Sequence, residues 1–165
     1  MQKRFIVFMM TALLGGSVVA CGDDDDDEPT GPQPEVFVAT LTGAAEVPPV
    51  TTNASGTARV EFTPTGLSWT VNVTNIQGVT TGGAHIHASP TTTTTNTAGV
   101  VLNLNPNTAV TTGLLTAGTA TATNTGNAIS MDSLKVLIRT GRAYVNVHTT
   151  ANPGGHIRGQ LVPGT

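Results

Sequence analysis

Residues 57–74, TARVEFTPTGLSWTVNVT, decide the fold class, because they hold two alternating segments around a short turn. Apolar side chains occupy every second position in both segments: Ala58, Val60 and Phe62, then Leu67, Trp69, Val71 and Val73. Successive side chains of a strand point to opposite faces, so each segment has one apolar face. The sequence Pro64-Thr65-Gly66 is typical of a turn. We predict a half-buried antiparallel hairpin with Trp69 anchored in its core.

Similar short segments lie on both sides of this hairpin. Strands are expected over residues 35–41, 83–87, 99–104, 111–123, 144–149 and 157–162. One segment departs from the pattern: Leu134, Leu137 and Ile138 have helical spacing, Ser130 can cap a helix, and Gly141 can end it. The sequence therefore predicts an all-β domain with one short helix near residues 131–140.

The composition excludes several functions. Charged residues make up 10% of the chain. Six of the ten acidic residues lie in residues 23–28, and without Lys3 and Arg4 the folded part is close to neutral. A near-neutral domain without a basic stripe is not expected to bind nucleic acid. Cys21 is the sole cysteine, which excludes an intrachain disulfide and a cysteine-rich metal cluster. Hydrolase, Walker and dinucleotide motifs are absent, so an enzyme is not the favoured interpretation.

The first twenty residues have the pattern of a secretory signal. Lys3 and Arg4 precede an apolar run from Phe5 to Val19. The run ends in Val18-Val19-Ala20-Cys21, which resembles the lipobox of bacterial lipoproteins. The resemblance implies cleavage before Cys21 and lipid attachment to this residue. The apolar run is short for a transmembrane anchor.

Residues 21–34 are expected to form a tether between the lipid and a β domain over residues 35–163. The run is acidic and then proline-rich, without apolar periodicity, and like charges keep such a segment extended. Gly22, rather than an aspartate, follows Cys21, which under the lipoprotein sorting rule implies the outer membrane. Either the periplasmic face or the cell surface remains open as the location.

Three of the four histidines lie in strongly patterned strands. In Gly83-Ala84-His85-Ile86-His87 the two imidazoles share one face, at rungs about 7 Å apart. His148 ends the strand Ala143–His148, and His156 begins the next strand. If the fold gathers them at one end of the scaffold, His85, His87 and His148 suit Zn(II) or Cu(II), with His156 as a fourth ligand.

Supporting residues for such a site are also present. Glu46, Asn146 and Asn152 are candidate hydrogen-bond acceptors that would orient the imidazoles. The alternative is a structural network, in which the histidines hydrogen-bond to one another, to Asn146 or to loop backbone. In that alternative Glu46 pairs with Arg158 and joins the first loop to the last strand.

Four phrases occur in an order that resembles the CHRD domain, the repeated module of chordin that is also found in bacterial secreted proteins. They are LTGAAEVPP (41–49), AHIH (84–87), YVNVHT (144–149) and NPGGHIRGQL (152–161). The resemblance implies an immunoglobulin-like antiparallel β-sandwich or barrel, for which a likeness to copper/zinc superoxide dismutase has been suggested. The family usually has an acidic residue where this chain has His156, so the resemblance does not carry a carboxylate role to this position.

Two classes of function remain. The first is a lipid-anchored module of the cell envelope that binds an unidentified protein or glycan, and the sequence favours this class. The second is an envelope copper- or zinc-binding protein with a histidine cluster, with dismutase-like chemistry as one form of it. A dismutase normally needs a larger set of histidine and aspartate ligands, and Asp132 is the one aspartate beyond the tether.

Overall fold

The structure is a computed structural model that describes residues 33–89, 97–124, 127 and 129–164. Residues 32–165 make one compact unit. The expected signal peptide, the lipidated Cys21, most of the tether and the threonine-rich loop at 91–95 lie outside the described residues. Among the residues described, no helix is long and apolar enough to cross a membrane.

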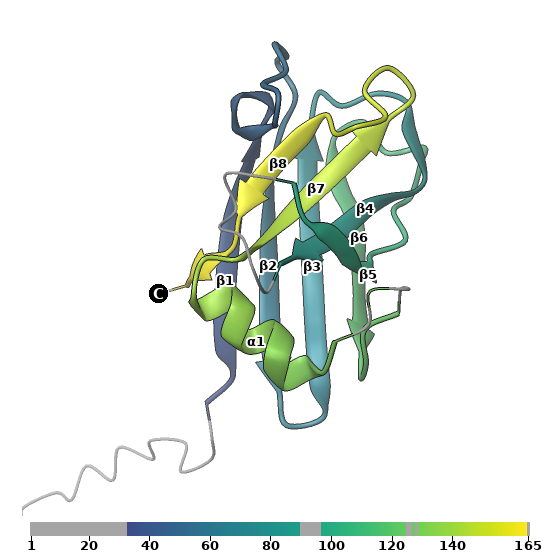
Figure 1. Ribbon diagram of the computed structural model, residues 1–165. Coiled ribbons are helices and arrows are strands. Elements are labelled where there is room, and N and C mark those ends of the chain that lie inside the picture. Colours follow the sequence, from purple (N-terminus) through teal and green to yellow (C-terminus); the bar gives the residue numbers. More distant parts are fainter. Residues whose placement is uncertain (1–32, 90–96, 125–126, 128, 165) are drawn as a thin grey trace, which may run out of the picture. The chain divides into compact units, whose positions relative to one another are not determined.

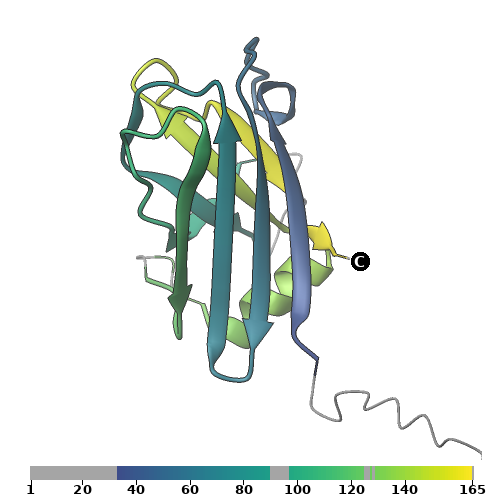
Figure 2. The ribbon, with the colours of Figure 1, turned by 180° about the vertical axis from the view of Figure 1, so that it is seen from behind.

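The architecture is one curled antiparallel sheet and one α-helix (Figures 1 and 2). Its strands are β1 (Glu35–Thr42), β2 (Ser55–Thr63), β3 (Gly66–Thr74), β4 (Val79–Ala88), β5 (Gly99–Asn103), β6 (Gly113–Ala120), β7 (Ala143–Thr149), β8 (Ile157–Gln160) and β9 (Val162–Pro163). The strand order is β5-β4-β7-β8-β1-β2-β3-β6, and β9 pairs with β1. A single turn of 3-10 helix, η1 (Gly43–Ala45), follows β1.

The curl brings two halves of the sheet face to face. The half made of β4, β5, β7 and β8 lies in front of β1, β2, β3 and β6 in Figure 1, and Figure 2 shows the same layers from behind. Apolar side chains from both halves meet in one core, which includes Phe37, Trp69, Ile86 and Val145. The predicted all-β sandwich or barrel is confirmed, with one continuous curled sheet forming both layers.

The hairpin that the sequence predicts is β2–β3. Its register pairs Val60 with Trp69 and Phe62 with Leu67, so the two apolar faces coincide. Trp69 is 8% exposed, and its indole nitrogen donates to the Thr116 hydroxyl at 3.3 Å. A Cβ on Gly118 would lie 2.6 Å from the Trp69 ring, so only glycine leaves room for the indole at this position of β6. Trp69 therefore anchors the core, as expected.

The predicted short helix is α1 (Met131–Arg139), at the end of the unit where β1 begins (Figure 1). The Ser130 hydroxyl accepts from the Ser133 amide at 3.1 Å, which caps the helix. Three buried side chains, Leu134, Leu137 and Ile138, face the core. Gly141 ends the segment at a φ of +70°, which glycine adopts without strain.

Candidate functional site

The histidine cluster lies on the outward face of β4 and β7. These strands are neighbours, and their register pairs His85 with Asn146 and His87 with Tyr144. The alternate residues Ala84 and Ile86 are fully buried in the core. Because side chains alternate along a strand, the histidines point away from that core. The cluster therefore sits on a sheet face, not at the loop end of the scaffold where we expected it.

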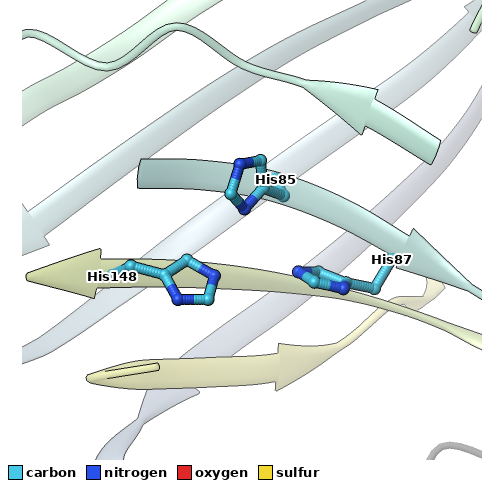
Figure 3. Close-up of side chains that lie close together, drawn as sticks. All are labelled: His85, His87 and His148. Atoms are coloured by element: carbon cyan, nitrogen blue, oxygen red, sulfur yellow. The ribbon is translucent and has the colours of Figure 1, made fainter. Parts of the chain in front are cut away.

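The three imidazoles of His85, His87 and His148 converge on one space (Figure 3). One nitrogen from each ring can serve as a ligand atom, and these three atoms all lie within 4.8 Å of one another. The ring centroids are 5.5 Å apart for His85 and His87, 5.0 Å for His85 and His148, and 6.0 Å for His87 and His148. Each ring has one nitrogen that is buried without a hydrogen-bond partner: His85 Nδ1, His87 Nε2 and His148 Nε2.

Backbone carbonyls hold the opposite nitrogen of these rings. His87 Nδ1 lies 2.9 Å from the Ala98 carbonyl oxygen, and His148 Nδ1 lies 3.0 Å from that of Pro153. A carbonyl only accepts, so both rings carry their proton on Nδ1 and leave a lone pair on Nε2. The Gly82 carbonyl accepts a hydrogen bond from the His85 ring and thereby raises the pKa of His85. His85 Nδ1 has no hydrogen-bond partner, so His85 carries its proton on Nε2.

Burial keeps the rings neutral. The pKa of His85 and of His87 is lowered to about 4, mainly by burial and in smaller part by the neighbouring His148. Burial also lowers the pKa of His148, and the Pro153 carbonyl opposes this effect. At pH 7 each ring is therefore uncharged, which is the state in which imidazole binds a metal.

A stacked column runs beside the cluster. The ring of His87 lies parallel to that of Tyr144, with centroids 4.8 Å apart and an interplanar angle of 4°. The Arg158 guanidinium carbon lies 3.5 Å from the Tyr144 centroid. The Tyr144 hydroxyl accepts a hydrogen bond from the Ala98 amide at 3.0 Å, and the Ala98 carbonyl oxygen holds His87 Nδ1. Tyr144 thus packs on one face of His87, and the Ala98 carbonyl holds its Nδ1.

Two predicted supporting residues contact each other next to the cluster. The Asn146 side-chain amide donates to Glu46 Oε2 at 3.4 Å, and both side chains are nearly fully buried. Burial raises the pKa of Glu46 to about 7, although the Arg158 charge and the Asn146 hydrogen bond act in the opposite direction. Arg158 therefore interacts with Glu46 electrostatically while it stacks on Tyr144.

The structure places His156 and Asn152 apart from the three converging rings. His156 Nε2 lies 2.9 Å from the Thr52 hydroxyl, and its Nδ1 lies 3.0 Å from the Thr149 hydroxyl. Both ring nitrogens are thus occupied, and His156 is not among the residues whose ligand atoms converge. Asn152 acts through its backbone, which exchanges hydrogen bonds with Thr149 in the turn after β7.

Sequence reasoning missed Tyr144 and the carbonyls of Gly82, Ala98 and Pro153. One sequence pattern could have identified the tyrosine: Tyr144 and Asn146 occupy alternate positions before His148, so they share its face of the strand. The carbonyl partners come from a strand irregularity and two loops. Their positions depend on tertiary structure, which residue spacing does not encode.

The donor set fits a borderline transition metal. Neutral imidazoles suit Zn(II) and Cu(II), and both metals accept three protein ligands with a fourth position open. In a tetrahedral zinc site with Zn–N bonds of about 2.1 Å, ligand nitrogens lie about 3.4 Å apart. Since the three donors lie within 4.8 Å, ring rotations of roughly an ångström at the nitrogen would suffice. Buried lone pairs without a partner are costly, and a bound metal would satisfy all three at once.

Comparison with known proteins gives one family. The model of the family described as the CHRD domain matches residues 37–161, which is more than half of the chain. The matched region contains the histidine cluster, the Tyr144 column and Glu46. Comparison with curated proteins and with solved structures finds no match.

Proposed function

Because the chain belongs to the CHRD domain family, we propose that it is a binding module of the bacterial cell envelope that holds one transition-metal ion at His85, His87 and His148. The observation that carries the proposal is the set of three buried imidazole lone pairs that face one space without a hydrogen-bond partner. Zn(II) and Cu(II) are the two metals that this donor set favours.

The supporting hydrogen bonds favour metal binding over a purely structural role. A structural network would use both nitrogens of each ring, as His156 does with Thr52 and Thr149. In the cluster, one nitrogen of His87 and one of His148 are held by a backbone carbonyl, and the other is left free. Histidines that ligate metals characteristically donate their second N–H to such an acceptor. The cluster resembles a prepared ligand set.

We propose that the three histidines bind the metal, and we propose no reaction catalysed there. A bound ion would supply a Lewis-acidic centre, and copper would add a redox couple. The chain's own residues orient the ligands: Tyr144 stacks on His87, and the Pro153 carbonyl fixes His148. The fourth ligand expected from His156 is not part of the proposal, since its nitrogens bind two threonine hydroxyls. Dismutase chemistry would need ligands beyond these three.

Membrane attachment through Cys21 belongs to the same proposal. The apolar run, the lipobox-like residues 18–21 and the acidic tether support a lipid anchor, with the outer membrane as the destination. Replacing Cys21 with serine should move the protein from the membrane fraction to the soluble fraction. Unchanged membrane attachment of the Cys21→Ser variant would contradict the anchor.

The competing function is a module that binds an unidentified protein or glycan without any metal. Calorimetric titration of the full chain in detergent with Zn(II) and Cu(II) separates the two. One ion per chain is expected for the wild type, and none for the double variant His85→Ala/His87→Ala. His156→Gln is the matched control and should bind like the wild type. A wild type that binds no ion and keeps its melting temperature when metal is added leaves the protein or glycan module as the function.

A further inference from the structure

A second polar site is lined in part by the turn whose Pro153 carbonyl holds His148. Its walls are the loop after η1, which carries Glu46, Val47, Pro48 and Val50, and the turn at residues 151–155. These residues line an open cavity of about 220 Å³. No metal at the histidines is needed to form it, so this site stands independently of the proposed function.

Glu46 supplies an unsatisfied acceptor at this cavity. Its side chain is 5% exposed, and Oε1 is buried with no hydrogen-bond partner, while Oε2 accepts from Asn146. A Cβ on Gly155 would lie 2.6 Å from both carboxylate oxygens, so the backbone of the turn packs directly on the carboxyl group. A buried acceptor without a donor costs about 1–3 kcal/mol, and more when the group is charged. Oε1 is therefore a buried acceptor that no donor among the described residues satisfies.

The walls determine which donor fits. Calcium takes six to eight oxygen ligands, and the cavity offers one carboxylate side chain. Zinc and copper prefer nitrogen and sulfur ligands, which these lining residues lack. A primary ammonium carries three donors on an aliphatic stem. Val47, Pro48, Val50, Ala151 and Pro153 give the stem apolar walls, and Glu46 gives the ammonium its counter-charge.

We propose that this cavity binds a primary alkylammonium group through Glu46 Oε1, either from a free amine or from a lysine side chain of a partner protein. Burial raises the pKa of Glu46, and Arg158 and Asn146 oppose this effect by favouring the ionised carboxylate. The bound ammonium would add the remaining favourable contact. Pro153 lines the cavity, and its carbonyl oxygen also contacts His148 Nδ1. Binding of an ammonium group in the cavity would therefore also change the surroundings of the His148 imidazole.

The test uses the full chain in detergent and amide NMR, with n-butylammonium as the probe and n-butanol as its neutral counterpart. Butylammonium should shift the amides of Gly154 and Gly155 saturably, and butanol should not. The Glu46→Gln variant should bind at least tenfold more weakly, while Glu61→Gln, a carboxylate on β2 that pairs with Arg59, should bind like the wild type. Equal responses to both probes, no saturable response, or unchanged binding in Glu46→Gln would overturn the proposal.

A second variant covers the case in which Glu46→Gln does not fold. Gly154 lines the cavity and a Cβ there meets nothing within 4 Å, so Gly154→Leu should be tolerated and should narrow the cavity and weaken the response. Undiminished binding in this variant contradicts the site. Comparison of butylammonium with N-acetyl-lysine methylamide then distinguishes the sources. Tighter binding of the lysine derivative indicates a partner's side chain, and tighter binding of butylammonium indicates a free amine.

Discussion

His87 and Tyr144 lie parallel on neighbouring strands, with their ring centroids 4.8 Å apart and their planes within 4° of each other. The two residues are a cross-strand pair of β4 and β7. They also share Ala98, whose amide donates to the tyrosine hydroxyl and whose carbonyl lies against His87 Nδ1. Tyr144 therefore positions one of the three proposed ligands by stacking and through a common backbone partner.

Two substitutions of Tyr144 separate these effects. Tyr144→Phe keeps the stack and removes one hydrogen bond, so the free energy of unfolding should fall by about 1 kcal/mol with little change in metal affinity. Tyr144→Ala removes the stack, and should cost about 3–5 kcal/mol in stability and at least tenfold in affinity. Urea unfolding and calorimetry measure both quantities. Wild-type affinity in a folded Tyr144→Ala variant would show that the stack does not position His87.

Gly82 tests whether its carbonyl orients His85. This glycine has a φ of +68° within the register shift of β4, and a Cβ there meets nothing within 4 Å. Gly82→Ala should lose about 1 kcal/mol of stability from backbone strain, and should also weaken metal binding. Gly141→Ala is the matched control, because Gly141 has a φ of +70° and equally open space. Both variants should lose similar stability, and only Gly82→Ala should lose affinity; equal affinities would remove the orienting role of Gly82.

The histidine cluster predicts how the stability of the metal-free protein depends on pH. The pKa of His85 and of His87 is about 4 when folded, against 6.5 for an ordinary histidine. Between these values the unfolded chain binds protons that the folded chain does not, so their contribution to stability falls as the pH drops from 6.5 to 4. Urea unfolding of the wild type and of His85→Ala/His87→Ala across this range measures the effect. A wild type that loses no more stability than the variant would contradict the neutral cluster.

Glu46 predicts the opposite trend. Its pKa is about 7 when folded, so between pH 4.5 and 7 the unfolded chain ionises first and the folded state is disfavoured as the pH rises. Glu46→Gln removes this effect. The stability of the variant relative to the wild type should therefore increase from pH 4.5 to pH 7.5. A difference that does not change with pH would mean that Glu46 is ionised like an exposed carboxylate.

The core makes a prediction that is separate from the site. Gly118→Ala forces a Cβ to within 2.6 Å of Trp69, its cross-strand neighbour on β3. Overpacking of this kind costs about 1–3 kcal/mol. Thermal unfolding should show the loss, and metal binding should be unchanged because β3 and β6 carry no proposed ligand. A Gly118→Ala variant as stable as the wild type would contradict the tight packing of the indole.

Local patterns predict the elements of this fold, and long-range pairing determines the site. Alternation in residues 57–74 identifies β2 and β3, and the spacing of Leu134, Leu137 and Ile138 identifies α1. Alternation also puts His85 and His87 on one face. The third ligand depends on the pairing of β4 with β7 in a register that sets His85 opposite Asn146. No local pattern encodes that choice of neighbour.

His156 is a ligand that the sequence predicts and the fold does not bring to the cluster. The sequence predicts His156 as a fourth ligand, but its ring, directly before β8, lies between Thr52 and Thr149. Thr52 is 104 residues away in the chain. Side-chain type and spacing therefore indicate candidate ligands, and the strand order determines which of these candidates lie close together.

X-ray absorption spectroscopy of the zinc-loaded chain tests the central claim most directly. The three-histidine site predicts a first coordination shell that contains three imidazole nitrogens at Zn–N distances of about 2.0–2.1 Å. The His85→Ala/His87→Ala variant should lose this imidazole coordination. A spectrum with only oxygen scatterers, or one that the double substitution leaves unchanged, would contradict metal binding at His85, His87 and His148.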